Sequence, residues 1–311
     1  MQRRDFVGRV TAATAGAALA ACGDGQADTA AKPTFVFVHG AWHGGWCWSE
    51  VVRLLAEQGY PSVALDLPGH GLTARFPVAY LAQPQDTAAL ATQASPLAAL
   101  TLTDYRDHAL RVIRGLVGGG SGPVILVGHS LGGATLSAVA EAEPALVRRL
   151  VYLTAFVPVA LPTVLQYLLR PDFAGSEVPP LFVADPAAVG ASRINHASAD
   201  TAYVARARSA FYHDVSDEAF AAVAHLLTPD EPIQAFTTPV GATAARWGSV
   251  PRTFIRCTGD RAIPIAVQDK MIAEADALTP NNRFVQQTLT TSHSPFVSSP
   301  APLVSALIAQ A

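Results

Sequence analysis

Short apolar runs and amphipathic stretches alternate along the chain from residue 35 onward. The apolar runs are rich in β-branched and aromatic residues, Gly-containing turns follow them, and the next stretches carry apolar residues at helical spacing. Runs that are apolar throughout are typical of strands buried on both faces of a parallel sheet. The pattern therefore predicts repeated strand–helix units around a parallel sheet, which is an α/β fold.

Six strands are predicted from this alternation, and they are residues 35–38, 62–67, 124–127, 150–153, 253–257 and 284–289. A helix follows the first strand, because Trp48, Val51, Val52 and Leu55 share one helical face and Gly59 provides a stop. The other predicted helices are residues 105–117, 131–141, 265–275 and 302–309. We therefore expect a mostly parallel six-stranded sheet with helices on both faces.

Two long segments do not fit the alternation. Residues 73–103 carry prolines and many small residues, and they indicate a long excursion with one or two short helical turns. Residues 156–250 place Pro-rich turns between short helical pieces, such as residues 200–212 and 217–227. We expect a core formed by residues 33–155 and 251–311, with a helical cap, residues 156–250, inserted between two core strands.

The first residues have the layout of a targeting signal rather than of a folded element. Residues 1–21 place a basic head before a short segment of small residues, which predicts an export signal. The pair Arg3 and Arg4 resembles a twin-arginine signal, and the run that ends at Cys22 resembles a lipobox, in which Cys22 becomes a lipid-modified N-terminus. The alternative is an ordinary signal cleaved nearby, with Cys22 incidental. We expect an exported protein of the periplasm or cell envelope, with residues 22–32 as a polar tether and a lipid on Cys22 as its only membrane attachment.

Composition narrows the class of partner. Of the 311 residues, 50% are hydrophobic and 14% charged, against a usual charged fraction of about 25%. The net charge is −3 and the Lys and Arg residues are scattered, which argues against nucleic acid as a partner. No run reaches the roughly 20 apolar residues of a membrane-spanning helix. Cys47 and Cys257 have no zinc or disulfide spacing, and we expect free, buried thiols.

The strongest motif surrounds Ser130, in the run Gly128-His129-Ser130-Leu131-Gly132. It follows an apolar strand and precedes an Ala-rich helix, the context in which G-x-S-x-G exposes a nucleophilic serine on a sharp strand-to-helix turn. The flanking glycines permit that turn because they bring no side chains to it. We therefore predict that Ser130 is the nucleophile of an acyl-transfer reaction.

A serine nucleophile needs a base held by an acid, and in this architecture both follow the serine along the chain. Of the later histidines, only His293 lies in the loop after the last predicted core strand. Three others, His196, His213 and His225, fall in the cap, where we expect solvated or hydrogen-bonded surface positions. Asp260 follows the strand at residues 253–257 through a Gly turn, and we predict that it is the acid. Asp269 and Asp276 are interpreted as solvated helix charges.

The oxyanion of acyl transfer needs preorganised N–H donors. We predict one donor at Leu131 and one in the glycine-rich loop at residues 39–46, where Ala41 is the first choice and Trp42 the second. His39 and His43 have the spacing of a metal pair, but no carboxylate lies nearby, so we expect no metal. His70 is interpreted as structural.

Residues 37–48, 64–71 and 151–158 make the chain resemble the α/β-hydrolase superfamily over residues 33–311, and more narrowly the branch of plant methylesterases and hydroxynitrile lyases. Residues 264–268 and 292–295 are similar to bacterial pyrethroid-hydrolysing carboxylesterases of that branch. The resemblance implies a compact core with a helical cap over a largely apolar pocket, and no metal or cofactor.

The predicted function is that of a serine carboxylesterase, which hydrolyses small to medium apolar esters through an acyl-enzyme. We expect Gly40, His129, Phe76, Tyr80 and Tyr167 in the substrate pocket. One alternative is a hydroxynitrile-lyase-type reaction. The resemblance argues against it, since those lyases carry Thr at the position of Gly40 and Lys at that of Ser294. The other alternative is a non-catalytic ligand-binding relative. The partner is a small-molecule ester, and the oligomeric state stays open.

Overall fold

A computed structural model describes residues 31–311, and the predicted export signal and Cys22 lie outside them. The main sheet has the strand order β2-β1-β3-β4-β7-β8, and every neighbouring pair is parallel. Its strands are β1 (Phe35–Val38), β2 (Ser62–Leu65), β3 (Val124–His129), β4 (Val147–Leu153), β7 (Arg252–Cys257) and β8 (Val285–Leu289). The predicted six-stranded α/β fold is confirmed, with strand ends shifted by a few residues.

Burial follows position in the sheet. Strands β1 and β3 lie in its middle, and all their residues are buried, which explains why they are apolar throughout. Strand β8 forms an edge, and its Val285 and Gln286 are exposed. The central position of β3 carries Ser130, which follows it directly, to the middle of the carboxyl edge of the sheet.

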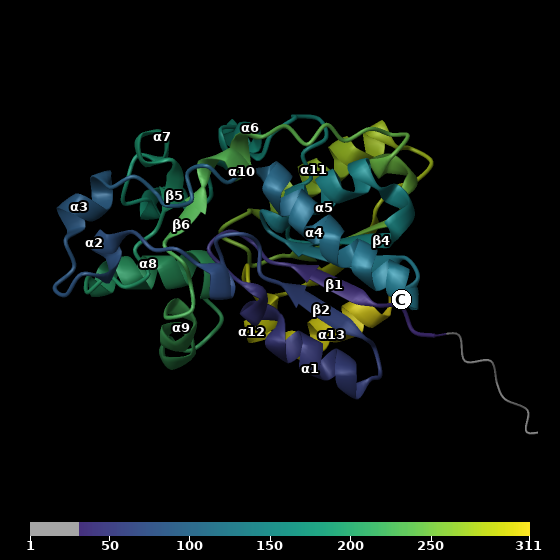
Figure 1. Ribbon diagram of the computed structural model, residues 1–311, viewed down its shortest axis with the longest axis horizontal. Coiled ribbons are helices and arrows are strands. Elements are labelled where there is room, and N and C mark those ends of the chain that lie inside the picture. Colours follow the sequence, from purple (N-terminus) through teal and green to yellow (C-terminus); the bar gives the residue numbers. More distant parts are fainter. Residues whose placement is uncertain (1–30) are drawn as a thin grey trace, which may run out of the picture. The chain divides into compact units, whose positions relative to one another are not determined.

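Helices cover both faces of the sheet (Figure 1). On one face lie α1 (Ser49–Glu57), α12 (Pro295–Ser298) and α13 (Pro300–Ile308). On the other lie α4 (Leu102–Leu116), α5 (Gly132–Ala142) and α11 (Ile265–Leu278). Helix α4 begins three residues before its predicted start, because Thr101 and Asp104 form a reciprocal capping box there.

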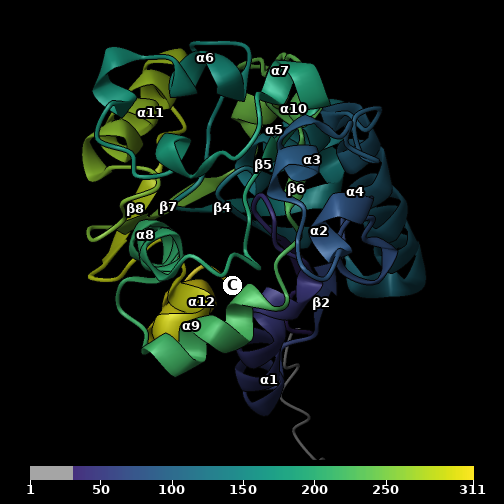
Figure 2. The ribbon, with the colours of Figure 1, turned by 90° about the vertical axis from the view of Figure 1, so that its left-hand side faces the viewer.

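The excursion and the cap gather at one end of the sheet, which faces the viewer in Figure 2. The excursion holds α2 (Val78–Leu81) and α3 (Thr87–Thr92). The cap holds α6 (Val164–Leu168), α7 (Pro186–Val189), α8 (Thr201–Tyr212), α9 (Asp217–Ala224) and α10 (Ile233–Thr237). It also contains an antiparallel pair, β5 (Ala191–Arg193) and β6 (Asp230–Pro232), which the sequence pattern did not predict.

Short helical turns complete the chain. They are η1 (Gly45–Trp48), η2 (Gly71–Thr73), η3 (Val117–Ser121), η4 (Pro144–Leu146), η5 (Pro171–Phe173), η6 (Pro179–Leu181) and η7 (Trp247–Ser249). Within residues 31–311, no helix combines the length and the apolar character that crossing a bilayer requires. Cys47 and Cys257 are buried free thiols, as predicted.

A buried ion pair joins the two cap strands to the excursion. Arg193 on β5 donates two hydrogen bonds to Asp230 on β6, at 2.6 and 2.8 Å, and neither side chain is exposed. The same guanidinium donates to the carbonyls of Leu90 and Gln93 in the excursion, at 2.6 and 2.8 Å. Because a buried charge is tolerated only when its hydrogen bonds are satisfied, these contacts fix β5, β6 and the segment around α3 as one unit.

Candidate active site

Ser130 occupies the sharp turn between β3 and α5. Its backbone has φ = +52°, a left-handed conformation that is strained for a residue with a side chain. A Cβ added to Gly128 would lie 2.4 Å from Leu136 Cδ1, and one added to Gly132 would lie 2.7 Å from the carbonyl oxygen of His39. The turn therefore requires glycine on both sides of the serine, as the motif predicted.

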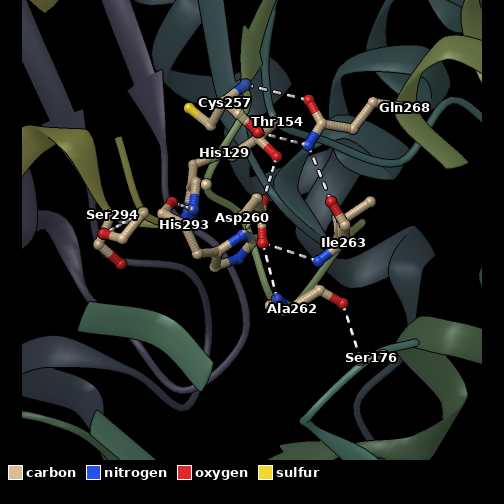
Figure 3. Close-up of polar contacts among 12 residues, drawn as sticks. His129, Thr154, Ser176, Cys257, Asp260, Ala262, Ile263, Gln268, His293 and Ser294 are labelled. Carbon is tan, nitrogen blue, oxygen red and sulfur yellow. Dashed lines mark hydrogen bonds and ion pairs between the residues drawn. The ribbon is translucent and has the colours of Figure 1, made fainter. Parts of the chain in front are cut away.

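Asp260 and His293 form a buried pair at the same edge of the sheet. Asp260 follows β7, His293 follows β8, and Asp260 Oδ2 lies 2.6 Å from His293 Nδ1 (Figure 3). Ser130 and His293 both line one cavity. Within the described residues no hydrogen bond joins them, and in serine hydrolases this contact often tightens only when substrate binds. The structure thus brings together the three predicted catalytic residues.

The carboxylate of Asp260 is held by more than the histidine. Its Oδ1 accepts hydrogen bonds from the N–H groups of Ala262 and Ile263, at 2.7 and 2.8 Å. Its Oδ2 accepts a second bond, from the hydroxyl of Thr154, a residue whose backbone has φ = +37° at the end of β4. These three donors leave the carboxylate one orientation, with Oδ2 toward His293.

The side chain of Gln268 shapes the loop that carries Asp260. Its Oε1 accepts from the N–H of Cys257, and its Nε2 donates to the carbonyls of Cys257 and Ile263, at distances of 2.8 to 3.1 Å (Figure 3). Gln268 is fully buried on α11. Nothing in the local sequence pattern of Gln268 or Thr154 marks a buried polar contact, so these roles could not be predicted.

His129 directly precedes the nucleophile, is fully buried and is not among the residues that line the cavity, so its predicted place in the substrate pocket is not supported. Its Nε2 lies 2.9 Å from the carbonyl oxygen of His293, and its ring packs edge-on against Phe296. Burial and the neighbouring His293 lower the pKa of His129 well below its usual value, so the ring is neutral and donates one N–H to that carbonyl. His129 therefore helps to fix the backbone of His293.

Two backbone N–H groups are available for an oxyanion. Ala41 and Leu131 line the cavity beside Ser130, and neither N–H has an acceptor among the described residues. The second-choice donor, Trp42, is wrong, because its N–H already donates to Glu231 Oε2 at 3.1 Å. The pair Ala41 and Leu131 matches the predicted oxyanion hole.

The cavity above Ser130 has a volume of about 540 Å³ and a predominantly apolar wall. The cap supplies most of that wall, through Leu165, Leu168, Leu169, Phe173, Val178, Pro179, Phe182, Phe211, Ile233 and Phe236. Among the described lining residues, Asp185 and His293 are the only ionisable ones. Pockets of 300 to 1,000 Å³ commonly hold small-molecule ligands, so the cavity suits a neutral, largely apolar molecule.

Four other predicted pocket residues lie outside the cavity wall. Phe76 and Tyr80 stack on each other in the excursion, with ring centroids 5.8 Å apart. Tyr167 turns to α11, where its hydroxyl donates to Glu274 at 3.0 Å. Gly40 lies directly behind the nucleophile, and a Cβ there would be 2.7 Å from both His129 Nδ1 and Ser130 Cβ. Their predicted place in the pocket is therefore not supported by the cavity lining. For Phe76, Tyr80 and Tyr167, the packing of the cap and the excursion decides which side chains face the cavity.

The remaining histidines have structural surroundings. His213 Nε2 lies 2.7 Å from the carbonyl oxygen of Gly259, beside the acid. His196 was expected at the surface, but it is buried, and burial lowers its pKa to about 3. His70 is also buried, with Nε2 2.9 Å from Glu231 Oε2. In the part of the chain that the structure describes, no cluster of His, Cys, Asp and Glu could hold a metal ion.

Comparison with known proteins agrees with this geometry. Residues 35–306 match the alpha/beta hydrolase family. A pyrethroid hydrolase of Sphingobium wenxiniae is 28% identical over 272 residues, covering 88% of this chain and 85% of that protein. Methyl jasmonate esterase 1 of Vitis vinifera is 27% identical over 284 residues, covering 86% and 93%. The crystal structure of a pyrethroid hydrolase from Sphingobium faniae matches with a TM-score of 0.68 and 26% identity, covering 89% of this chain and 96% of that one.

The chain belongs to the alpha/beta hydrolase family, and its relatives identify it as a carboxylic ester hydrolase. The resemblance to methylesterases and bacterial pyrethroid hydrolases, which the sequence predicted, is confirmed.

Proposed function

We propose that the protein is a serine carboxylesterase that cleaves neutral, largely apolar esters through an acyl-enzyme. The observation that carries this proposal is the convergence of Ser130, the Asp260–His293 pair and two free N–H groups on one apolar cavity. A nucleophile, an oriented base and preorganised donors are what ester hydrolysis through a covalent intermediate needs.

In the acylation step, Ser130 Oγ attacks the carbonyl carbon of the ester and its proton passes to His293 Nε2. Asp260 holds Nδ1 of His293, so that Nε2 faces the cavity, and its charge stabilises the imidazolium. The oxyanion accepts hydrogen bonds from the N–H groups of Ala41 and Leu131. The bond to the alcohol oxygen then breaks, His293 returns the proton to that oxygen, and the acyl group remains on Ser130.

In the deacylation step, water attacks the acyl carbon and gives a proton to His293. The same two N–H groups stabilise the second oxyanion, the bond to Ser130 Oγ breaks, and Oγ recovers the proton from His293. The products are the free acid and the regenerated enzyme. No described cationic side chain lines the cavity, so an anionic product has no partner that would retain it.

The substrate class follows from the cavity wall. A volume of about 540 Å³ and a wall of Leu and Phe side chains favour an ester with a bulky apolar acyl or alcohol part. Relatives include a pyrethroid hydrolase and a methyl jasmonate esterase, so a pyrethroid ester and methyl jasmonate are suitable first substrates.

The lyase alternative receives no support from the site. Gly40 offers no side-chain donor, and a threonine there would press against His129 and Ser130, because even its Cβ would be 2.7 Å from both. Ser294 carries no positive charge to stabilise a leaving cyanide, and it is fully buried and does not line the cavity. The filled triad positions likewise speak against a purely non-catalytic binding role.

A product assay decides between these reactions. The purified protein should release acid and alcohol from an apolar ester and no cyanide from mandelonitrile above the uncatalysed rate. Ser130→Ala, the matched control, should lose about 10⁴-fold or more of the ester turnover. Cyanide release that exceeds hydrolysis of every ester tested would make the lyase reading correct instead.

A further inference from the structure

Trp42, the residue after the oxyanion donor Ala41, has a backbone conformation that a bulky residue rarely adopts. Its φ is +63°, in the left-handed region, and the residue is 5% exposed. Such conformations are strained and persist only where the surroundings hold them. The contacts of Trp42 therefore show what holds the oxyanion loop in place.

Every polar group of Trp42 is bonded to the cap. Its N–H donates to Glu231 Oε2 at 3.1 Å, and its indole N–H donates to the carbonyl of Ser192 at 2.9 Å. Its carbonyl accepts from the N–H and the hydroxyl of Thr228, at 2.9 and 3.1 Å. These partners lie 150 to 189 residues further along the chain. The cap therefore holds the oxyanion loop from the outside.

The carbonyl of Ala41, which belongs to the same peptide group as the Trp42 N–H, is also held. His43 Nδ1 lies 2.7 Å from the carbonyl oxygen of Ala41, and His43 Nε2 contacts the hydroxyl of Tyr212, at the end of α8 in the cap. Burial lowers the pKa of His43 to about 3, so the ring is neutral. Nδ1–H donates to Ala41 and Nε2 accepts from Tyr212, a chain of two hydrogen bonds from the cap to the loop.

Glu231 on β6, which accepts from the Trp42 N–H, also contacts two residues of the core. Its side chain is 1% exposed, its Oε1 accepts from the hydroxyl of Tyr105 on α4 at 2.8 Å, and His70 Nε2 lies 2.9 Å from its Oε2. A buried carboxyl group is costly unless its oxygens are bonded. Here the hydroxyl of Tyr105 on the core helix fixes the carboxyl group by a hydrogen bond, the His70 ring lies against it, and the carboxyl group in turn accepts from the N–H of Trp42.

We propose that Glu231 and the Tyr212–His43 pair are positioning residues of the oxyanion hole. Together they hold the carbonyl and the N–H of the Ala41–Trp42 peptide. The Ala41 N–H belongs to the preceding peptide, so these contacts limit the backbone rotation at Ala41 through which that N–H could turn away from the substrate oxygen. The cap thus completes the catalytic site as well as the pocket wall. This inference rests on the proposed function, because it assumes that Ala41 serves as an oxyanion donor.

The test is the kinetics of Glu231→Leu, which removes the acceptor and keeps an apolar side chain of similar size. Loss of one oxyanion donor costs about 10²- to 10³-fold in kcat, so a misaimed donor should lower kcat by about 10- to 100-fold. KM should stay within about threefold, because the donor acts on the transition state. Affinity for a trifluoromethyl ketone, which forms a tetrahedral adduct, should fall in parallel with kcat.

Two matched variants separate positioning from mere stabilisation. Glu231→Gln keeps an oxygen for the Trp42 N–H and should recover most of the lost kcat. Tyr152→Phe removes a buried hydroxyl whose partners, Ser137 and Trp247, lie outside the oxyanion loop, so it should lower thermal stability and leave kcat unchanged. Folded Glu231→Leu with wild-type kcat, or equal kcat losses in Glu231→Leu and Tyr152→Phe, would overturn the proposal.

A third variant decides the case if Glu231→Leu does not fold. Tyr212→Phe removes only the hydroxyl that bonds to His43, the residue that holds the Ala41 carbonyl. It should lower kcat with KM unchanged. An unchanged kcat would overturn the proposal. Ser130→Ala is assayed beside these variants, because wild-type protein that is no more active than Ser130→Ala would mean that the proposed function itself has failed.

Discussion

At the scale of single residues, the two glycines beside Ser130 give a sharp prediction. In Gly132→Ala the new Cβ would lie 2.7 and 2.9 Å from the backbone oxygens of His39 and Val38, which cannot move aside. Such overpacking costs about 1–3 kcal/mol, so chemical denaturation should show that loss, together with lower esterase activity. Gly115→Ala is the control, because nothing lies within 4 Å of its added Cβ in α4. It should gain about 0.5–1 kcal/mol.

Buried neutral histidines predict how stability depends on pH. His43 and His196 have pKa values of about 3 in the folded chain, lowered by burial from 6.5. Between pH 3 and 6.5 the unfolded chain therefore binds more protons, and the free energy of unfolding falls as pH is lowered through this window. Urea denaturation at pH 7, 6 and 5 should show midpoints that fall steadily.

His196→Leu isolates one of these groups. Both ring nitrogens of His196 lack hydrogen-bond partners among the described residues, so the substitution breaks no hydrogen bond there. The pH slope should decrease by about one proton below pH 6. A slope that does not change in this variant would mean that His196 titrates normally in the folded protein.

The candidate catalytic residues were predictable from sequence because each follows a strand. Ser130 follows an apolar run and stands between glycines, and Asp260 and His293 follow the last two core strands. Parallel strands bring their carboxyl ends to one edge, so sequence order alone places the three together. Glu231 could not be found in this way, because its contact with Trp42 spans 189 residues and depends on how the cap packs.

At the scale of elements, the same reasoning worked for the core and failed for the cap. The central core strands β1 and β3 carry continuous, mostly apolar runs that sequence makes visible, whereas β5 and β6 are three residues each and include Arg193, Asp230 and Glu231. Charged residues are rarely fully buried, and here an ion pair makes the burial tolerable. The predicted pocket residues Phe76, Tyr80 and Tyr167 lie outside the cavity wall for a related reason, since aromatic character does not reveal which way a side chain faces.

We expect the cap residues that line the cavity to determine which esters are preferred. Phe236 on α10 is part of the cavity wall, so Phe236→Ala should raise KM for a bulky apolar ester by more than for a short-chain ester. Phe76→Ala is the matched control, because Phe76 lies outside the wall. The quantity to compare is the ratio of kcat/KM for the bulky ester to kcat/KM for the short-chain ester. Equal changes of this ratio in the two variants would contradict the assignment of specificity to the cap wall.

At the scale of the whole molecule, we propose that residues 33–155 and 251–311 supply the chemistry and that residues 156–250 supply both the pocket wall and the support of the oxyanion loop. Six strands set the positions of Ser130, Asp260 and His293. The cap holds the backbone next to Ala41 through its hydrogen bonds to Trp42. Core and cap are therefore expected to unfold together, since each completes the other's buried hydrogen bonds.

Export is a further prediction for the whole chain, and it concerns residues outside the described ones. We propose that Arg3 and Arg4 direct export and that Cys22 carries a lipid. Arg3→Lys with Arg4→Lys should leave precursor in the cytoplasm of the native host. Intact-mass analysis of the wild-type protein should find an acylated N-terminal Cys22, whereas mature protein that begins beyond Cys22 would reject the anchor and leave export standing.

The most direct test of the account is to catch the acyl-enzyme on Ser130. A chromogenic apolar ester mixed rapidly with the protein should release a burst of alcohol that approaches one equivalent per active site if deacylation is slower than acylation. Acid quench followed by peptide mass analysis should find the acyl group on Ser130 and nowhere else. Ester turnover that continues in Ser130→Ala, or an acyl adduct on another residue, would contradict the central claim.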